Sequence, residues 1–193
     1  MHIFSMIYLG NEKILSGGIK TGISIIQFDK EYKNYNFLLK IDQNKTINNI
    51  IQIKRNNFIS LEEEKSISKW ILYEDKNKIE KVTFLKNGQS INNICDISKK
   101  YFAYQTNNYI CIININTLKE KRRIRYGQTN NIYKYNDKII GVISDNQHEI
   151  VFFDIENGTK IFEIKNDYNI LGFLKSKRAK EDIITIAHVS FPL

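Results

Sequence analysis

The chain has 193 residues, 42% of them hydrophobic, with 29 basic and 21 acidic side chains and a net charge of +8. This length and apolar content exclude a disordered protein and suit one domain with a sizeable core, and a single proline excludes Pro-rich linkers. The basic balance is compatible with a nucleic-acid or anionic-membrane partner. The abundance of Lys, Asn and Ile is also what an AT-rich coding sequence produces, so charge alone does not indicate a ligand.

The start of the chain, residues 1–10, lacks the charged beginning and long apolar stretch of a secretory signal. No run approaches the roughly 18 apolar residues of a membrane helix. The two cysteines, Cys95 and Cys111, lie in apolar runs without metal-ligand spacing, which predicts buried, reduced thiols. We therefore expect a cytoplasmic protein without metal or cofactor.

The chain repeats itself with a period of about 40 residues. The phrase "TINNIIQIKRNNFIS" at 46–60 returns as "SINNICDISKKYFAY" at 90–104. Each unit begins with an apolar lead residue, at Met6, Ile50, Ile94, Ile132 and Ile170. In the first four units a second apolar residue follows eight positions later, at Ile14, Phe58, Phe102 and Ile140. The units run approximately from 3 to 46, 47 to 90, 91 to 129 and 130 to 167, with a partial fifth from 168 to 193.

Each unit contains four short apolar runs separated by Asn, Asp, Gly and Lys turns. In the third unit the predicted strands are 92–97, 100–105, 108–114 and 119–126. No stretch has the spacing of an amphipathic helix. Since a single four-stranded sheet cannot bury both of its faces, repeated sheets must stack on one another. The pattern predicts an all-β fold, a β-propeller of four-stranded antiparallel blades forming one domain over 1–193.

The end of the third predicted strand carries an aromatic or aliphatic residue followed by a polar one in most units: Phe28-Asp29, Trp70-Ile71, Ile113-Asn114 and Phe153-Asp154. The stretches "INTLKE" at 115–120 and "IENGTK" at 155–160 follow two of these pairs. In these features the chain resembles the WD-repeat β-propeller family over nearly its whole length. The resemblance implies a non-catalytic scaffold that holds protein partners. Another propeller family with four-stranded blades is the alternative.

Four and a half units are fewer than the seven blades usual in WD-repeat propellers, which need roughly 280–300 residues. Three interpretations remain open: a fragment of a longer product, an open partial propeller completed by another chain, or a small closed ring. An open arrangement would expose unpaired strand edges, which favour pairing with another chain.

No catalytic constellation is recognisable. The three histidines are not grouped with Cys or carboxylates, and the Gly-rich stretch at 15–22 is interpreted as a turn. The acidic run Glu62–Glu64 is interpreted as a solvated turn between the second and third strands. We nominate no catalytic, cofactor-binding or metal-binding residue.

The basic segment 119–127, "KEKRRIRYG", is the strongest candidate for an anion or partner site. As the outermost strand, it should place Lys121, Arg123 and Arg125 on one face and Arg122 on the other. Such a strand either blocks aggregation as a charged edge or binds lipid headgroups, RNA phosphates or an acidic protein.

Loops between first and second strands are expected to form one basic rim, with Lys54, Arg55, Lys99, Lys100, Lys138, Lys175, Lys177 and Arg178. Glu62, Glu63, Glu64 and Asp145 are expected on the opposite rim. This asymmetry would steer an acidic partner, or it reflects only polar turns. The sequence favours a scaffold for protein–protein interaction within a larger complex, with a basic propeller binding phosphoinositide membranes or RNA as the alternative. A propeller enzyme is a third possibility, for which no residue can be named.

Overall fold

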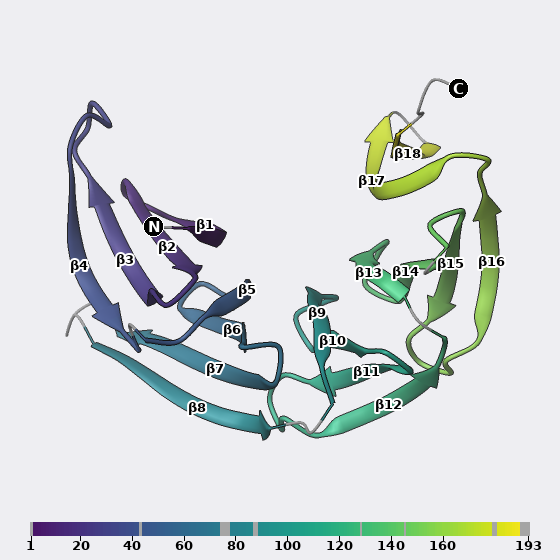
Figure 1. The fold of residues 1–193 in the computed structure, drawn as a ribbon, viewed down its shortest axis with the longest axis horizontal. Helices are drawn as coiled ribbons and strands as arrows, with labels where there is room; N and C mark the ends of the chain where they lie inside the picture. The colour runs from purple at the N-terminus through teal and green to yellow at the C-terminus, as the bar shows by residue number, and fades with distance from the viewer. Residues whose placement is uncertain are drawn as a thin grey trace. The chain divides into compact units, whose positions relative to one another are not determined.

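The computed structural model describes residues 2–42, 44–73, 78–86, 89–127, 129–144, 146–178 and 181–189. Its regular elements are β-strands, labelled β1 to β18 in Figure 1. The described residues contain no helix, and so none that is long and apolar enough to cross a membrane. The all-β prediction is confirmed.

Sixteen strands form four sheets of four antiparallel strands, in chain order within each sheet. The first sheet comprises β1 (Ile3–Gly10), β2 (Lys13–Gly18), β3 (Gly22–Phe28) and β4 (Tyr35–Ile41). The second comprises β5 (Ile47–Lys54), β6 (Asn57–Glu62), β7 (Ser66–Tyr73) and β8 (Lys78–Lys86). The third comprises β9 (Ile91–Asp96), β10 (Tyr101–Thr106), β11 (Tyr109–Asn114) and β12 (Glu120–Arg125).

The fourth sheet comprises β13 (Thr129–Lys134), β14 (Ile139–Ser144), β15 (Glu149–Asp154) and β16 (Lys160–Lys165). A two-stranded hairpin of β17 (Asn169–Arg178) and β18 (Glu181–Val189) follows it. Each of the four full units expected from the sequence contains one blade-like sheet, which confirms the repeat.

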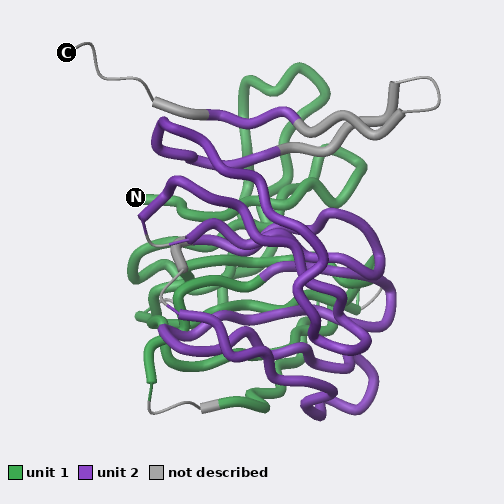
Figure 2. Tube along the Cα trace, turned by 90° about the vertical axis from the view of Figure 1, so that its right-hand side faces the viewer, with its two compact units in different colours: residues 1–94 green, residues 95–193 purple. Residues whose placement is uncertain are grey.

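The chain forms two compact units, residues 1–94 and 95–193, coloured separately in Figure 2. The first unit contains the first two sheets. The second contains most of the third sheet, the fourth sheet and the hairpin. The boundary between the units falls within β9.

Within each unit, neighbouring sheets stack face to face through equivalent positions. In the first unit, Leu15, Ile23 and Ile25 of the first sheet form one apolar cluster with Ile50, Phe58, Trp70 and Leu72 of the second. We call the face that carries Leu15, Ile23 and Ile25, or their equivalents, the trailing face of a sheet. The face that carries Ile50, Phe58 and Trp70, or their equivalents, is the leading face. A trailing face is thus covered by the leading face of the next sheet.

The second unit repeats this contact twice. The trailing face of the third sheet, with Ala103, Ile110 and Ile112, clusters with a leading face formed by Ile132, Ile140, Phe153 and Ile155. The trailing face of the fourth sheet, with Ile150 and Phe152, clusters with Ile170 and Phe173 of the hairpin. Burial of these side chains is the main favourable contribution to the fold, at about 25 cal/mol per Å² of apolar surface.

Small residues on the trailing face allow this close approach. A Cβ built on Gly17 would lie 2.7 Å from Cγ2 of Ile47, which is closer than carbon atoms pack. A Cβ on Gly141 would collide with the ring of Phe173 in the same way. Glycine at these two positions therefore sets the spacing between stacked sheets.

We expect Gly17→Ala to lower the free energy of unfolding by about 1–3 kcal/mol, because the added methyl forces the first two sheets apart. Gly127→Ala is the matched control, since a Cβ there would meet nothing within 4 Å. Urea denaturation of both variants measures the effect. Equal stability of the two variants would contradict this account of the stacking.

Candidate functional site

The leading face of the first sheet is exposed at its margin, whereas Ser16, Ser24 and Ile26 at its centre are buried. Paired residues of antiparallel strands project to the same side, so the register defines this face as Met6, Tyr8, Ile14, Ser16, Ser24, Ile26, Phe28, Tyr35, Phe37 and Lys40. Met6 is 63% exposed and Tyr8 61%, whereas Ile50, the equivalent of Met6 in the second sheet, is 4% exposed. The first sheet therefore presents to solvent a surface that the repeat elsewhere buries.

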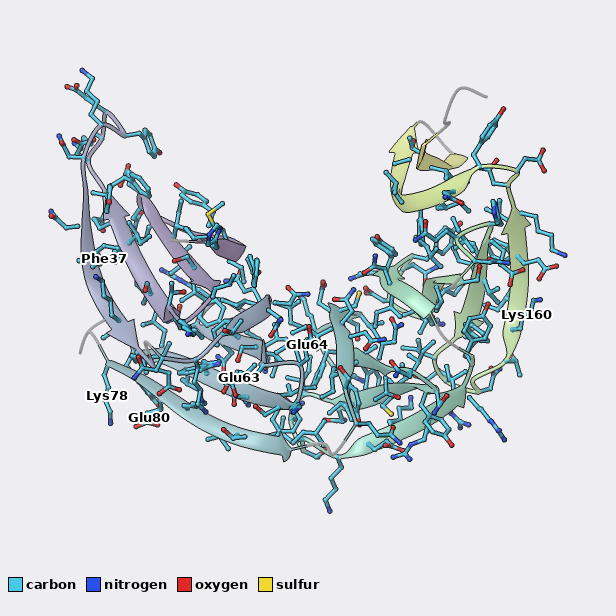
Figure 3. The ribbon with its side chains drawn as sticks, in the orientation of Figure 1. Phe37, Glu63, Glu64, Lys78, Glu80 and Lys160 are labelled. Atoms are coloured by element: carbon cyan, nitrogen blue, oxygen red, sulfur yellow. The ribbon has the colours of Figure 1, made fainter. Side chains whose placement is uncertain are left out.

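Aromatic side chains extend this face along its outer strand. The ring of Phe28 lies 6.0 Å from that of Tyr35, and Tyr35 meets Phe37 edge-to-face at 5.7 Å. The ammonium group of Lys40 lies 3.6 Å from the ring centroid of Phe37, which Figure 3 labels on β4. Aromatic side chains are enriched at protein-binding surfaces.

The repeated Asn-Asn phrase has a structural explanation. Asn48 is an extra residue, a β-bulge between the pairs Ile47–Glu62 and Asn49–Leu61. Its side-chain oxygen accepts a hydrogen bond from the amide of Glu64 in the next turn, at 3.2 Å. Asn130 makes the equivalent bulge in the fourth sheet. The first Asn of the phrase thus marks a bulge in the first strand of the second and fourth sheets.

The second Asn links the first strands of successive units. Asn49 Nδ2 donates to Oδ1 of Asn93 at 3.0 Å and to the carbonyl of Ile94 at 3.2 Å. Ser5, the equivalent residue in β1, accepts from the amide of Ile50 at 3.0 Å, and its hydroxyl lies within donating distance of Asn49 Oδ1. We call Ser5, Asn49 and Asn93 the polar ladder. Its hydrogen bonds align β1, β5 and β9 with one another, because hydrogen bonds are directional and apolar stacking is not.

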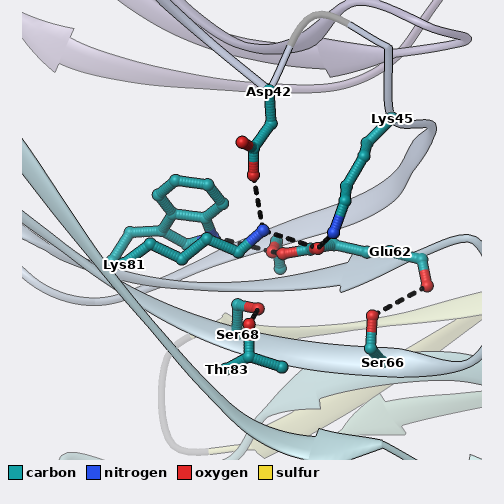
Figure 4. A network of polar contacts seen from close by, with 9 residues as sticks. Asp42, Lys45, Glu62, Ser66, Ser68, Lys81 and Thr83 are labelled. Carbon is teal, nitrogen blue, oxygen red and sulfur yellow. Dashed lines mark hydrogen bonds and ion pairs between the residues drawn. The ribbon is translucent and has the colours of Figure 1, made fainter.

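An ionic network surrounds the buried Glu62 at the end of β6 (Figure 4). Trp70 Nε1 donates to Ser60 Oγ at 2.7 Å, and Ser60 donates to Glu62 Oε1 at 3.1 Å. The other carboxylate oxygen of Glu62 accepts from Lys81 at 2.8 Å, and Lys81 also contacts Asp42 at 2.5 Å. The network therefore ties three strands of the second sheet to the loop that leaves the first sheet.

Glu62 is 1% exposed, so the expectation that 62–64 forms a solvated turn is wrong for this residue. Glu62 is the last residue of β6, where its side chain points into the sheet stack and is neutralised by Lys81 and, at 3.5 Å, Lys45. Glu63 and Glu64, labelled in Figure 3, are exposed as expected. The pKa of Lys81 is raised above its ordinary value: burial alone lowers it, but hydrogen bonds to Asp42 and Glu62 outweigh the burial.

The basic strand β12 is already partly neutralised. Lys121 forms an ion pair with Glu156 of the fourth sheet, and Arg123 pairs with Glu120 at 2.7 Å. Lys121 also donates to the Tyr101 hydroxyl at 3.1 Å. These carboxylates offset two of the five positive charges in the segment 119–127.

The expected alternation of 121, 123 and 125 fails at Lys121. Arg123 and Arg125 pair with Cys111 and Tyr109 as a regular strand requires, but a bulge between Arg122 and Glu120 leaves Lys121 unpaired in the register. Lys121 therefore turns toward the fourth sheet instead of sharing a face with Arg123.

Arg122 is half-buried, its side chain 3.0 Å from where a Cβ on Gly158 would lie. Arg125 is exposed and lines a hollow of about 250 Å³ with Asn108, Tyr109, Tyr126 and Gly127.

The basic residues named for the second, third and fourth sheets lie in or beside the turns between first and second strands. Lys54 and Arg55 connect β5 to β6, Lys99 and Lys100 connect β9 to β10, and Lys138 precedes β14. All five side chains are exposed. The side chains of Lys175, Lys177 and Arg178, and residue Asp145, lie outside the described part of the chain, so the two rims stay a prediction.

The strand register shows whether the residue pairs noted at the ends of the third strands occupy equivalent positions in the four sheets. Trp70 lies opposite Phe58, and Ile113 and Phe153 lie opposite Phe102 and Ile140 in the same way. In the first sheet, however, Ile26 lies opposite Ile14, so Phe28-Asp29 falls two residues beyond the equivalent pair.

Asp29 nevertheless caps its turn, accepting from the amide of Lys33 at 2.9 Å. Asn114 and Asp154 cap the corresponding turns of the third and fourth sheets, each through amides two and three residues on. The polar member of each of these pairs is thus a turn cap.

Both cysteines are buried and free. Burial raises the pKa of the Cys95 thiol to about 12 and also raises that of Cys111, which keeps both thiols protonated. No group of three or more His, Cys, Asp or Glu side chains in the described ranges could hold a metal ion. A cavity of about 30 Å³ near Leu9 and Arg55 has room for little more than one water molecule.

The comparisons with known proteins give no family. No family model matches the chain, and no curated protein matches it.

We expect Asn49→Asp to lower the free energy of unfolding by about 1–3 kcal/mol, because the carboxylate cannot donate to Asn93 and Ile94. Asn36→Asp, at an exposed position on β4, makes the same chemical change away from the polar ladder. Guanidinium denaturation at neutral pH compares them. The ladder has no structural role if both variants unfold at the same midpoint.

We expect Lys81→Met to lower the free energy of unfolding by about 2–3 kcal/mol, since it leaves the buried carboxylate of Glu62 with the Ser60 hydroxyl and with only the longer ionic contact, to Lys45. Lys33→Met is the control, because its ion pair with Glu31 is exposed and should contribute less than about 0.5 kcal/mol.

The raised pKa of Lys81 also predicts that the stability difference between wild type and Lys81→Met depends on pH. A raised lysine pKa stabilises the fold below the ordinary value of 10.5, and this stabilisation is lost as the pH rises through the folded-state pKa. The difference between wild type and Lys81→Met should therefore narrow above pH 10.5. A constant difference up to pH 12 would contradict a charged Lys81 in this network.

Proposed function

We propose that the protein is a non-catalytic scaffold of the WD-repeat β-propeller type, which binds another protein through the leading face of its first sheet. One observation carries the proposal: residues equivalent to Ile50, Phe58 and Trp70 are covered wherever sheets stack within a unit, yet Met6, the counterpart of Ile50 on the first sheet, is 63% exposed, and Ile14, the counterpart of Phe58, is only partly buried. Neighbouring side chains shield Ile26 at the centre of this face, but its margin is open, with Met6, Tyr8 and Tyr35 each more than half exposed.

An apolar sheet face of this kind favours association because burying it removes aromatic and aliphatic surface from water. All four strands beneath it belong to one hydrogen-bonded sheet, so the surface is formed before a partner binds. A preformed surface loses little conformational entropy on binding. The surface therefore has the chemistry and the rigidity of a docking site.

The assignment to the WD-repeat type is supported by the repeat of four-stranded sheets, by Trp70 on a third strand, and by the Asn114 and Asp154 turn caps. The scaffold role is supported by the protonated, buried thiols and by the absence of a metal-binding cluster among the described side chains.

The alternative, anion binding through 119–127, receives less support. The ion pairs of Lys121 and Arg123 reduce the charge that this strand offers to a phosphate. Binding to phosphoinositide membranes or RNA through this strand stays a prediction.

A photo-crosslinking amino acid tests the proposed docking face. Introduced at Met6 or Tyr8 in the cellular protein, it should form adducts with a partner, and both positions should reach the same segment of that partner. The same group at Val82, an exposed apolar residue on β8, is the control and should form no such adduct.

Met6→Asp in the chain that carries the cross-linker at Tyr8 should abolish the adduct, because a carboxylate would be buried unpaired. Equal labelling from Val82, or no adduct from either position on the first sheet, would overturn the proposal.

A further inference from the structure

The internal stacking contacts specify what kind of surface covers a leading face. In the first unit the cover is the trailing face of the preceding sheet, which carries Leu15, Ile23 and Ile25. In the second unit it is again a trailing face, with Ala103, Ile110 and Ile112. Neither unit stacks one leading face against another. The leading face of the first sheet is therefore suited to a trailing face of the same repeat.

The trailing face of the C-terminal hairpin carries exposed residues in the part that the structure describes. Phe173 of β17 and Ile186 of β18 are paired in register and pack against the fourth sheet. Thr185 and Ala187 flank Ile186 in β18, so they project from the opposite side, and both are exposed. Leu171, at the bulge of β17, is 53% exposed. The hairpin thus uses its leading face within the chain, and in the described part of its trailing face Thr185 and Ala187 are exposed, although a Cβ on Gly172, the residue paired with Ala187, would lie 3.1 Å from the Tyr133 hydroxyl.

The two uncovered faces are complementary in size. In the covered contacts, a small trailing residue receives a large leading one: Gly17 receives Ile47, and Gly141 receives Phe173. The free trailing face has the small residue Ala187, and the free leading face has the large residues Met6 and Tyr8. Inside each unit, a small residue of a trailing face against a large residue of a leading face sets the spacing between sheets. The same combination of residues is available between these two surfaces.

Resting on the proposed function, we propose that the partner is a second copy of this chain. The hairpin β17–β18 of one copy packs its trailing face on the leading face of the other copy's first sheet. The contact is head-to-tail, so the two copies use different surfaces, and each copy presents one of each kind.

Charge gives this contact a distinctive salt dependence. Each copy carries a net charge of +8, so two copies repel each other at low ionic strength. Salt screens this repulsion without weakening apolar contacts. Self-association should strengthen with salt, whereas binding of an anionic ligand to basic residues would weaken.

Light scattering coupled to size exclusion, on the purified full chain over a concentration series, tests the proposal. The wild-type chain and Val82→Asp should form dimers or larger assemblies. Met6→Asp removes the leading face, and Ala187→Asp removes the trailing face, so each variant alone should be a monomer with association weakened at least tenfold. Both residues are exposed, and thermal unfolding followed by circular dichroism checks that the variants are folded.

The mixture of the two variants distinguishes the geometry. Met6→Asp retains a trailing face and Ala187→Asp retains a leading face, so an equimolar mixture should form one-to-one dimers. If Ala187→Asp alone still dimerises, leading faces pair with each other and the head-to-tail contact is wrong. A wild-type chain that stays monomeric at 100 µM and high salt would also overturn it.

Failure of this inference is separable from failure of the proposed function. A monomeric chain that still cross-links from Met6 to a different protein in cells retains the docking function but loses self-association. A monomeric chain with no such adduct loses both.

Discussion

Burial of both faces of each four-stranded sheet is the constraint on which the rest of the structure depends. A sheet of this size has apolar residues on both sides, and each side needs a neighbour. The repeat answers this need by matching a trailing face to a leading face, as Leu15, Ile23 and Ile25 match Phe58 and Trp70. On the leading face of the first sheet this need is not met, because Met6 and Tyr8 stay exposed.

Apolar stacking alone does not determine how two sheets are aligned, because hydrophobic contacts are not directional. Two polar arrangements supply direction in the first unit. The polar ladder of Ser5, Asn49 and Asn93 aligns the inner strands, and the network around Glu62 links the inner part of the second sheet to its outermost strand through Lys81. Each partner group is hydrogen-bonded, which is the condition under which buried polar groups stabilise one arrangement over others.

The basic residues illustrate how tertiary contacts change the meaning of a sequence pattern. From the sequence, 119–127 is the densest cluster of positive charge. In the structure, Glu120 and Glu156 pair with two of its members, and a bulge separates Lys121 from the face that Arg123 and Arg125 share. The apolar residues of β1, by contrast, attracted no functional hypothesis from the sequence. They are candidates for a binding surface because no neighbouring sheet covers Met6 and Tyr8.

Period, strand order and strand positions were determined by the sequence itself, because alternation of apolar residues and turn chemistry are local properties. The lead residues and their partners eight positions later predicted the four sheets. Asn114 and Asp154 were recognised from the sequence as polar residues at the ends of third strands, and in the structure they cap the turns that follow. Burial was decided only by the tertiary structure. Met6 and Ile50 occupy the same position of the repeat, yet one is exposed and the other is buried, since burial depends on a neighbouring sheet. The burial of Glu62 was likewise decided by the tertiary structure. Its carboxylate is buried beside Lys81 and Lys45, and Lys81 also contacts Asp42; no local sequence pattern brings these residues together.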